Sequence, residues 1–142
     1  MEIRTFGVIG AGQMGAGIAQ VAAMSGLNVI MNDINEQLVN KGLDGITRLL
    51  GKSVEKGRMS SGDKDMIVSR IRTSVDLKDM EAADYVVEAA SERPDIKFKI
   101  FSDLDSICRE QVILASNTSS IPIGRIAANT KRPDRVAGMH FM

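Results

Sequence analysis

Apolar residues recur along the chain in short continuous runs that alternate with longer segments of three-to-four-residue spacing. The short runs predict buried strands, and the longer segments predict amphipathic helices. Runs with a continuous apolar centre are typical of parallel strands that are covered on both faces. The predicted strands span residues 3–9, 28–32, 71–74, 83–88, 112–116 and 135–139. The predicted helices span residues 13–25, 35–56, 61–70, a segment beginning at Pro94, and 123–128.

This alternation predicts an α/β fold with a doubly wound parallel sheet of the Rossmann kind. Right-handed crossovers give the strand order 3-2-1-4-5-6. The two helices between the second and third strands are longer than a simple crossover needs. We therefore expect residues 35–70 to form a helical hairpin that projects beyond the sheet. Without an internal repeat or linker, residues 1–142 are expected to form one domain.

The first long helix of this hairpin carries a stripe of apolar residues. Gly42 and Gly45 lie inside this helix and each costs about 1 kcal/mol relative to alanine, so tertiary packing must offset that cost. The expected apolar stripe consists of Leu38, Val39, Leu43, Ile46, Leu49, Leu50 and Val54.

A glycine-rich loop joins the first predicted strand to the first helix. Gly10 allows a tight turn, Gly12 lets the backbone approach a pyrophosphate, and Gly15 lets the helix pack closely on the strand. The free N–H groups and the dipole of the helix favour an anion at this point. Asp33 ends the second strand, where a carboxylate can bind ribose hydroxyls and would repel a 2′-phosphate. The combination predicts a dinucleotide site that prefers NAD to NADP.

Composition indicates which partners and which cellular compartment to expect for the chain. Of 142 residues, 44% are hydrophobic and 25% charged, and 18 basic residues balance 18 acidic ones. This balance gives no reason to expect a nucleic-acid or membrane partner, and no apolar run approaches the ~20 residues of a membrane span. The single cysteine, Cys108, fits a small buried hydrophobe better than a reactive thiol. No signal-peptide layout opens the sequence, so we expect a cytoplasmic protein.

Polar residues follow several of the predicted strands, and in parallel sheets ligands bind at these carboxyl ends. His140, the only histidine, follows the last strand and is suited to take a proton from an alcohol, although a structural role is the alternative. Asn117 and Ser119 could contact a substrate oxygen or a nicotinamide, or they could form a turn that caps the next helix. Glu92 and Lys97 flank a helix start, where an acidic residue is favourable without any function.

A basic stripe runs along the first hairpin helix. Arg48, Lys52 and Lys56 follow at four-residue spacing and therefore share one face. This face is either solvated or a binding surface for a phosphorylated part of a substrate.

Over essentially its whole length, the chain resembles the NAD-binding domain of the L-3-hydroxyacyl-CoA dehydrogenases. The block that contains Ser119, together with the Gly-x-His-Phe segment, is more specific than the glycine loop. The matching stretches are residues 10–19 (Gly-Ala-Gly-Gln-Met-Gly-Ala-Gly-Ile-Ala), Asp33, residues 86–92 (Val-Val-Glu-Ala-Ala-Ser-Glu), Lys97, residues 115–123 (Ala-Ser-Asn-Thr-Ser-Ser-Ile-Pro-Ile) and residues 138–141 (Gly-Met-His-Phe).

The resemblance implies oxidation of the 3-hydroxyl group of a 3-hydroxyacyl-CoA, such as 3-hydroxybutyryl-CoA, with hydride transfer to NAD. In this reaction His140 is the expected general base, and Ser119 is expected to hydrogen-bond the substrate oxygen. Lys52 and Lys56 become expected contacts to the CoA part. The residues expected to bind the cofactor are Gly10, Gly12, Gln13, Met14, Gly15, Asp33, Ala89, Glu92, Lys97 and Asn117.

The resembled family continues past the position of Met142 with a glutamate that pairs with the histidine and a helical C-terminal domain. We therefore expect this chain to bind NAD, to turn over weakly alone, and to have that helical domain as its partner, with self-association left open. Two alternatives remain: another NAD-dependent hydroxyacid dehydrogenase, or a standalone NAD-binding or sensing module.

Overall fold

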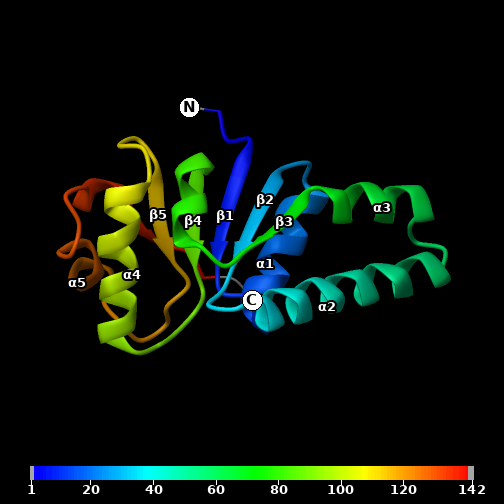
Figure 1. Ribbon diagram of the computed structural model, residues 1–142, viewed down its shortest axis with the longest axis horizontal. Coiled ribbons are helices and arrows are strands. Elements are labelled where there is room, and N and C mark those ends of the chain that lie inside the picture. Colours follow the sequence, from blue (N-terminus) through cyan, green and yellow to red (C-terminus); the bar gives the residue numbers. More distant parts are fainter. Residues whose placement is uncertain (1, 141–142) are drawn as a thin grey trace.

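The structure of the chain is a computed structural model that describes residues 2–140. Its strands form one six-stranded, all-parallel sheet in the order β3-β2-β1-β4-β5-β6, with helices on both faces (Figure 1). This arrangement confirms the predicted fold and strand order. The strands are β1 (Thr5–Ile9), β2 (Asn28–Asn32), β3 (Ile71–Ser74), β4 (Tyr85–Glu88), β5 (Ile113–Ser116) and β6 (Val136–Gly138). The helices are α1 (Gln13–Met24), α2 (Glu36–Glu55), α3 (Ser61–Ser69), α4 (Pro94–Ile107) and α5 (Ile123–Ala127), with short 3₁₀ helices at Leu77–Ala82 and Pro133–Arg135.

Strands β1 and β4 each begin two residues later than predicted, whereas the other predicted boundaries agree to within one residue. Asp84 fixes both starts, because its carboxylate accepts hydrogen bonds from the N–H groups of Arg4 and Thr5, each at 2.9 Å. The 3₁₀ helix at Leu77–Ala82 was not predicted. Six residues are too few to show a helical period in the sequence.

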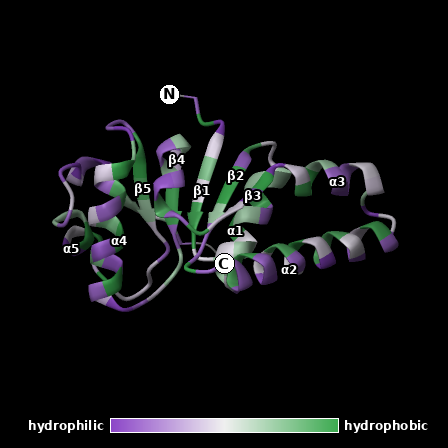
Figure 2. Cartoon of the chain, in the orientation of Figure 1, coloured by the Kyte–Doolittle hydropathy of each residue, from purple (hydrophilic) through white to green (hydrophobic). Residues whose placement is uncertain are grey.

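Two apolar layers enclose the sheet, one on each face. Helices α1, α2 and α3 cover one face, where Val8, Ile18 and Met31 are buried. Helices α4 and α5 cover the other, where Phe101 and Leu114 are fully buried. Figure 2 shows the hydrophobic strands in the middle and the hydrophilic residues concentrated on the outer turns of the helices. No helix within residues 2–140 is long and apolar enough to cross a membrane.

The helices α2 and α3 form the predicted hairpin, which extends sideways beyond the sheet (Figure 1). Both helices begin with a side-chain cap: Asn35 accepts the N–H of Leu38 at 2.9 Å, and Ser60 accepts the N–H of Asp63 at 3.0 Å. Such caps satisfy N–H groups that have no partner inside the helix. Gly57, with φ of 71°, ends α2 and starts the turn.

The apolar stripe of α2 is only partly buried. Leu38 and Leu49 are 37% and 54% exposed, whereas Ile46 and Leu50 are buried. The reason is the close approach of α2 to the glycine loop: a Cβ at Gly42 would lie 2.6 Å from the carbonyl oxygen of Ala11. The buried face of the helix is therefore narrower than its set of apolar residues.

Candidate functional site

The parallel sheet brings the predicted site residues to one edge. The glycine loop follows β1, Asp33 follows β2, and Asn117 follows β5. Glu92 lies in the loop after β4, and His140 follows β6 by two residues. Because all strands run in the same direction, these carboxyl ends meet at the same edge.

The glycine loop packs closely against other backbone atoms at Gly10 and Gly15 and is open at Gly12. Gly10 has φ of 106°, and a Cβ there would lie 2.9 Å from the backbone of Ala89. A Cβ at Gly15 would overlap the carbonyl oxygen of Gly10. Nothing lies within 4 Å of the Cβ position of Gly12. Only the backbone around Gly12 is therefore accessible to a ligand.

The start of α1 suits an anion. Its N-cap is Gly12, no side chain caps it, and its first turn contains no acidic residue. The N–H groups of this turn and the helix dipole therefore face open space. The carboxylate of Asp33 lies beside them and accepts the N–H groups of Ala11 at 2.8 Å and Ile34 at 2.7 Å. Asp33 thus holds the loop, and its remaining lone pairs are suited to ribose hydroxyls. These residues fit a dinucleotide such as NAD.

Glu92 connects the loops that follow β4 and β5. Its carboxylate accepts hydrogen bonds from Thr118 Oγ1 at 3.1 Å, from Ser120 Oγ, and from the N–H of Ser119. The bond from Ser120 is the main reason that the pKa of Glu92 lies below its ordinary value. Thr118 Oγ1 in turn accepts the N–H of Ile121 at 3.1 Å, so Thr118 builds the turn. Within residues 2–140 the Ser119 hydroxyl is exposed and has no hydrogen-bond partner, so it is available to contact a ligand.

Lys97 lies below this surface rather than on it. Its side chain is 1% exposed, and its ammonium pairs with the carboxylate of Glu88, which is 0% exposed. Ser116 Oγ lies 3.2 Å from Lys97 Nζ and donates to Glu88 at 3.0 Å. Glu88 and Ser116 lie at the predicted edge, but no role was predicted for either residue. Their partnership depends on β4, β5 and α4 meeting in space, which no spacing in the sequence reveals.

His140 is exposed at the end of the described chain. The N–H of Met139 donates to the carbonyl oxygen of Ser116 at 2.9 Å and so fixes the backbone just before the histidine. Among residues 2–140, no side chain hydrogen-bonds the imidazole. The backbone therefore positions His140 at the predicted edge, while its ring is not held by this part of the chain.

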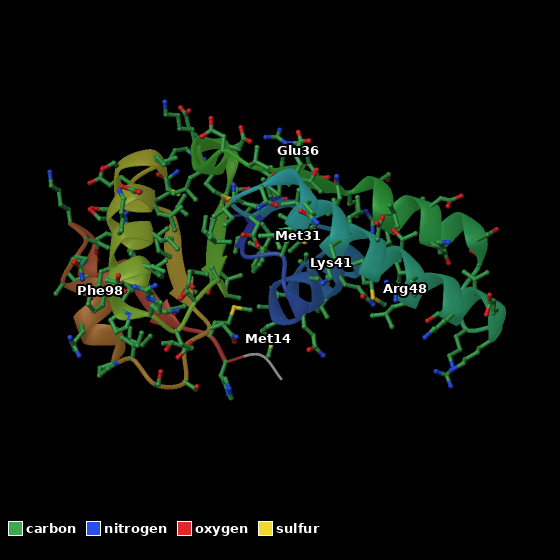
Figure 3. All side chains as sticks on the ribbon, turned by 60° about the horizontal axis from the view of Figure 1, so that its bottom comes forward. Met14, Met31, Glu36, Lys41, Arg48 and Phe98 are labelled. Carbon is green, nitrogen blue, oxygen red and sulfur yellow. The ribbon has the colours of Figure 1, made fainter. Side chains whose placement is uncertain are left out.

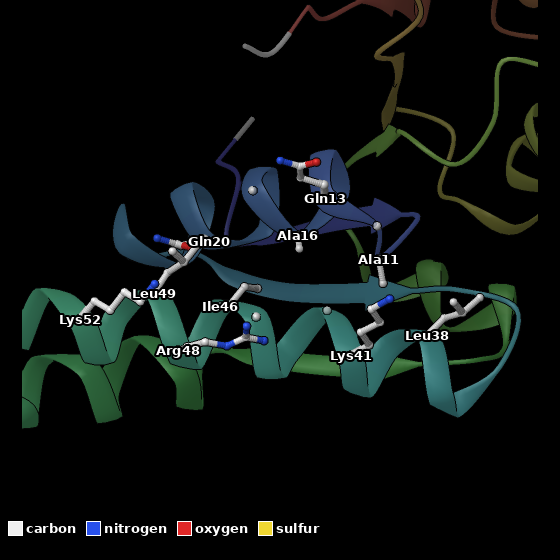
Figure 4. Close-up of a pocket in the computed structure, with 14 residues that line it drawn as sticks. Ala11, Gln13, Ala16, Gln20, Leu38, Lys41, Ile46, Arg48, Leu49 and Lys52 are labelled. Atoms are coloured by element: carbon white, nitrogen blue, oxygen red, sulfur yellow. The ribbon is translucent and has the colours of Figure 1, made fainter.

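A groove of about 520 Å³ runs between α1 and α2, beginning at the glycine loop (Figure 4). Three cationic side chains of α2 line it: Lys41, Arg48 and Lys52. In Figure 3, Lys41 and Arg48 of α2 lie on the same side of the molecule as Met14, which is in the first turn of α1. Lys56 does not line the groove, and Lys41, which was not predicted, does. The spacing of seven and four residues from Lys41 through Arg48 to Lys52 is the sequence signal for this shared face. The remaining lining residues are Ala11, Gly12, Gln13, Ala16, Gly17, Gln20, Leu38, Gly42, Gly45, Ile46 and Leu49.

Comparison with known proteins gives a consistent result. The sequence model of the family described as "3-hydroxyacyl-CoA dehydrogenase, NAD binding domain" matches residues 5–142. A probable 3-hydroxybutyryl-CoA dehydrogenase of Bacillus subtilis is 47% identical over 142 residues, which are 100% of this chain and 50% of that protein. A 3-hydroxyadipyl-CoA dehydrogenase of Escherichia coli is 42% identical over 99% of this chain and 30% of that protein.

A solved structure shows the same similarity. The crystal structure of (S)-3-hydroxybutyryl-CoA dehydrogenase from Ralstonia eutropha superposes with a TM-score of 0.97 at 47% identity, covering 99% of this chain and 50% of that one. The chain thus spans at most about half the length of these relatives. With the match over residues 5–142 and an anion-binding loop that fits NAD, the chain belongs to the family of 3-hydroxyacyl-CoA dehydrogenase NAD-binding domains.

Proposed function

We propose that this chain is the cofactor-binding half of an enzyme that oxidises the 3-hydroxyl group of a 3-hydroxyacyl-CoA. The observation that carries the proposal is the groove between α1 and α2. It shares Gly12 and Gln13 with the dinucleotide loop and carries three cations along its other wall. A nucleotide and an anionic substrate could thus lie side by side in this one groove.

The residues at the sheet edge take the following roles in the proposal. Bound NAD would supply the acceptor for the hydride from C3 of the substrate. His140 would take the proton of the 3-hydroxyl group, because a neutral imidazole is an effective base near neutral pH. The Ser119 hydroxyl, exposed on the β5–α5 loop, would hydrogen-bond the substrate oxygen. Glu92 and Asn117 would line the cofactor.

The α2 helix would bind the CoA part of the substrate. CoA carries phosphate groups, and Lys41, Arg48 and Lys52 place three cations along one wall of the groove. Leu38 and Leu49 also line the groove and expose apolar surface, which suits the less polar arm of CoA. Lys56 lies one turn beyond the groove, where it would contact only a ligand that extends along α2.

The acyl chain of the substrate is proposed to be short. The B. subtilis and R. eutropha relatives are named for 3-hydroxybutyryl-CoA, whereas the E. coli relative is named for 3-hydroxyadipyl-CoA. Identity is higher to the first two, so we propose 3-hydroxybutyryl-CoA. We further propose a helical C-terminal domain as the partner of this chain and the cytoplasm as its location. Self-association stays an open expectation.

Turnover by a chimera tests the proposal. The chain would be joined to the second half of the B. subtilis relative, and NADH formation from 3-hydroxybutyryl-CoA would be compared between the chimera and the chain alone. We expect the chimera to turn over and the chain alone to bind NADH while remaining about 100-fold slower or more, because the chain covers only 50% of the length of the B. subtilis relative. In the chimera, His140→Gln should lower kcat by roughly 100- to 10,000-fold while the Kd for NADH stays unchanged.

Two outcomes would favour the alternatives. Tight NADH binding by a folded chimera without turnover of any 3-hydroxyacyl-CoA would favour a sensing module. Turnover of a small hydroxy acid without CoA would favour another hydroxyacid dehydrogenase.

A further inference from the structure

Two buried polar side chains connect the ends of β2 and β3 beside the dinucleotide loop. Asn32 and Ser74 lie opposite each other in these neighbouring strands, and each is only 5% exposed. The amide of Asn32 donates to the hydroxyl of Ser74 at 3.1 Å. Replacing both members of such a buried pair by apolar groups can be neutral or stabilising. Stability alone therefore does not account for the pair, and its other contacts indicate what it holds.

Asp79 anchors this pair from outside the sheet. The hydroxyl of Ser74 lies 2.7 Å from a carboxylate oxygen of Asp79, in the 3₁₀ helix at Leu77–Ala82, and 3.0 Å from the carbonyl oxygen of Asp76. A hydroxyl has one hydrogen, and the carboxylate is both the closer and the stronger acceptor. Ser74 therefore donates to Asp79 while it accepts the amide of Asn32. Two hydrogen bonds in series thus connect the 3₁₀ helix to the end of β2.

The end of β2 in turn holds the glycine loop. The carbonyl oxygen of Asn32 accepts the N–H of Gly10 at 2.7 Å, and the carboxylate of Asp33 accepts the N–H of Ala11 at 2.8 Å. Two consecutive residues of β2 and its end thus bind two consecutive N–H groups of the loop. The N–H of Asp33 also donates to the carbonyl oxygen of Ser74 at 3.1 Å, which ties the same segment to β3.

The buried pair can influence a ligand through Asp33. Asn32 and Ser74 have almost no exposed side-chain surface, whereas Asp33 is partly exposed and carries the carboxylate suited to ribose hydroxyls. A shift of Asn32 would move both Asp33 and the glycine loop, because Asn32 precedes Asp33 in the chain and accepts the N–H of Gly10. The position of the carboxylate therefore depends on the pair.

We infer that Asn32, Ser74 and Asp79 are positioning residues for the adenosine end of the dinucleotide. They fix the carboxylate of Asp33 and thereby set how strongly the site prefers NADH to NADPH. The carboxylate repels a 2′-phosphate most strongly where the ribose hydroxyls bind, so a displaced carboxylate loses discrimination as well as affinity. The inference rests on the proposed function only in the role of Asp33 at the ribose, and it does not involve the acyl-CoA.

The ratio of the Kd values for NADPH and NADH tests the inference, with both values measured by calorimetry on this chain. A loss of stability alone would weaken both nucleotides equally and leave the ratio unchanged. Ser74→Ala removes the hydroxyl between Asn32 and Asp79 and should lower the ratio about threefold or more. In the Asp33→Asn background the same substitution should change the ratio by less than about 1.5-fold, because the displaced charge is already gone. A ratio unchanged by Ser74→Ala, or an equal change in both backgrounds, overturns the inference.

Two substitutions of Asp79 separate positioning from a direct effect of its charge. The amide oxygen introduced by Asp79→Asn can still accept the hydroxyl of Ser74, whereas Asp79→Ala leaves no acceptor. Both substitutions remove the charge and the ion pair with Arg72 at 3.5 Å. Asp79→Ala should therefore lower the ratio about threefold or more, and Asp79→Asn should keep it near the wild-type value. Equal losses in the two variants would assign the effect to charge and overturn the inference.

Glu81→Ala is the matched control for Asp79→Ala. Glu81 lies on the same 3₁₀ helix and is exposed, and its side chain forms no ion pair or hydrogen bond within residues 2–140. This variant should leave the ratio unchanged. If Ser74→Ala does not fold, the two Asp79 variants carry the test, because that side chain is 38% exposed and tolerates substitution better.

Failure of this inference is distinguishable from failure of the proposed function. A chimera that turns over no 3-hydroxyacyl-CoA, in a chain whose ratio falls with Ser74→Ala and Asp79→Ala, would refute the proposed function and support the inference. Turnover by the chimera, with a ratio that responds to neither substitution, would support the function and overturn the inference.

Discussion

At the residue scale, Arg132 and Asp84 show how much of this fold depends on single charged side chains. The guanidinium of Arg132 donates to the carbonyl oxygens of Asp105, Cys108, Arg109 and Val112 and to the carboxylate of Asp105. It thereby satisfies carbonyl groups at the end of α4 that lack helical partners. All of its N–H donors are used, so Arg132 has none to spare for a ligand.

Cys108 confirms the expectation of a small buried hydrophobe. The side chain is 6% exposed, and burial raises the pKa of the thiol to about 11. A thiol of that kind is largely protonated near neutral pH and correspondingly unreactive.

Asp84 supports a prediction about pH and stability. Its hydrogen bonds, first from the side chain of Arg109 and then from the N–H groups of Thr5 and Arg4, lower its pKa to about 2. Because the folded pKa lies below the unfolded value of 3.8, the stabilisation is complete above the unfolded value and is lost as the pH falls through the folded one. Arg109 is 44% exposed, so solvent weakens the pair. Asp84→Asn should therefore lower the free energy of unfolding by about 1–2 kcal/mol near neutral pH and by much less at about pH 2.

Urea unfolding at the two pH values measures this difference. Asp65→Asn, at an exposed aspartate of α3, is the control and should have little effect at either pH. A loss for Asp84→Asn that is equally large in acid would contradict the assignment.

At the element scale, the two glycines inside α2 differ in a way that sequence alone does not show. A Cβ at Gly42 would lie 2.6 Å from the oxygen of Ala11 and 3.2 Å from Cε of Met31, whereas nothing lies within 4 Å at Gly45. Gly42→Ala should destabilise the protein by about 1–3 kcal/mol by pushing α2 off the glycine loop. Gly45→Ala should stabilise it by about 0.5–1 kcal/mol through helix propensity.

Chemical denaturation of both variants is the measurement, and each variant serves as the control for the other. Weaker NADH binding by Gly42→Ala would follow from the displaced loop. Stabilisation by both substitutions would show that α2 has room to move at Gly42.

The helices α1, α2 and α4 could be predicted from the sequence because their apolar residues repeat along one face. The strands could be predicted because they are short continuous runs of apolar residues. The 3₁₀ helix at Leu77–Ala82 could not, because it is too short for a period. The glycine loop and Asp33 were predictable because strand, glycine loop, helix, strand and acidic residue follow one another in a fixed order along the chain. The burial of Lys97 against Glu88 was not, because their contact exists only after β4, β5 and α4 have packed.

At the scale of the whole molecule, binding of the nucleotide should couple to unfolding. The glycine loop lies between β1 and α1 and contacts α2 and the loop after β4, so the ligand would bind where four elements meet. NADH at about 100 times its Kd should raise the free energy of unfolding by about 2.7 kcal/mol. NADPH at the same concentration should stabilise less, because Asp33 would repel its 2′-phosphate.

Thermal unfolding followed by circular dichroism compares the two nucleotides. Asp33→Asn should narrow the difference between them, because the amide still accepts the N–H of Ala11 without the negative charge. Equal stabilisation by NADH and NADPH in the wild-type chain would refute the role of Asp33.

The central place of β1 has a consequence for the order in which the chain folds. One neighbour of β1 is β2, where Phe6 pairs with Val29; the other is β4, where Phe6 pairs with Tyr85. During synthesis β1 therefore waits for its second neighbour until β2, α2, α3 and β3 have been made. Contacts so distant along the chain slow folding and prolong the exposure of unpaired strand edges. Nascent chains stalled before β4 should thus be the form of this protein that most needs a chaperone.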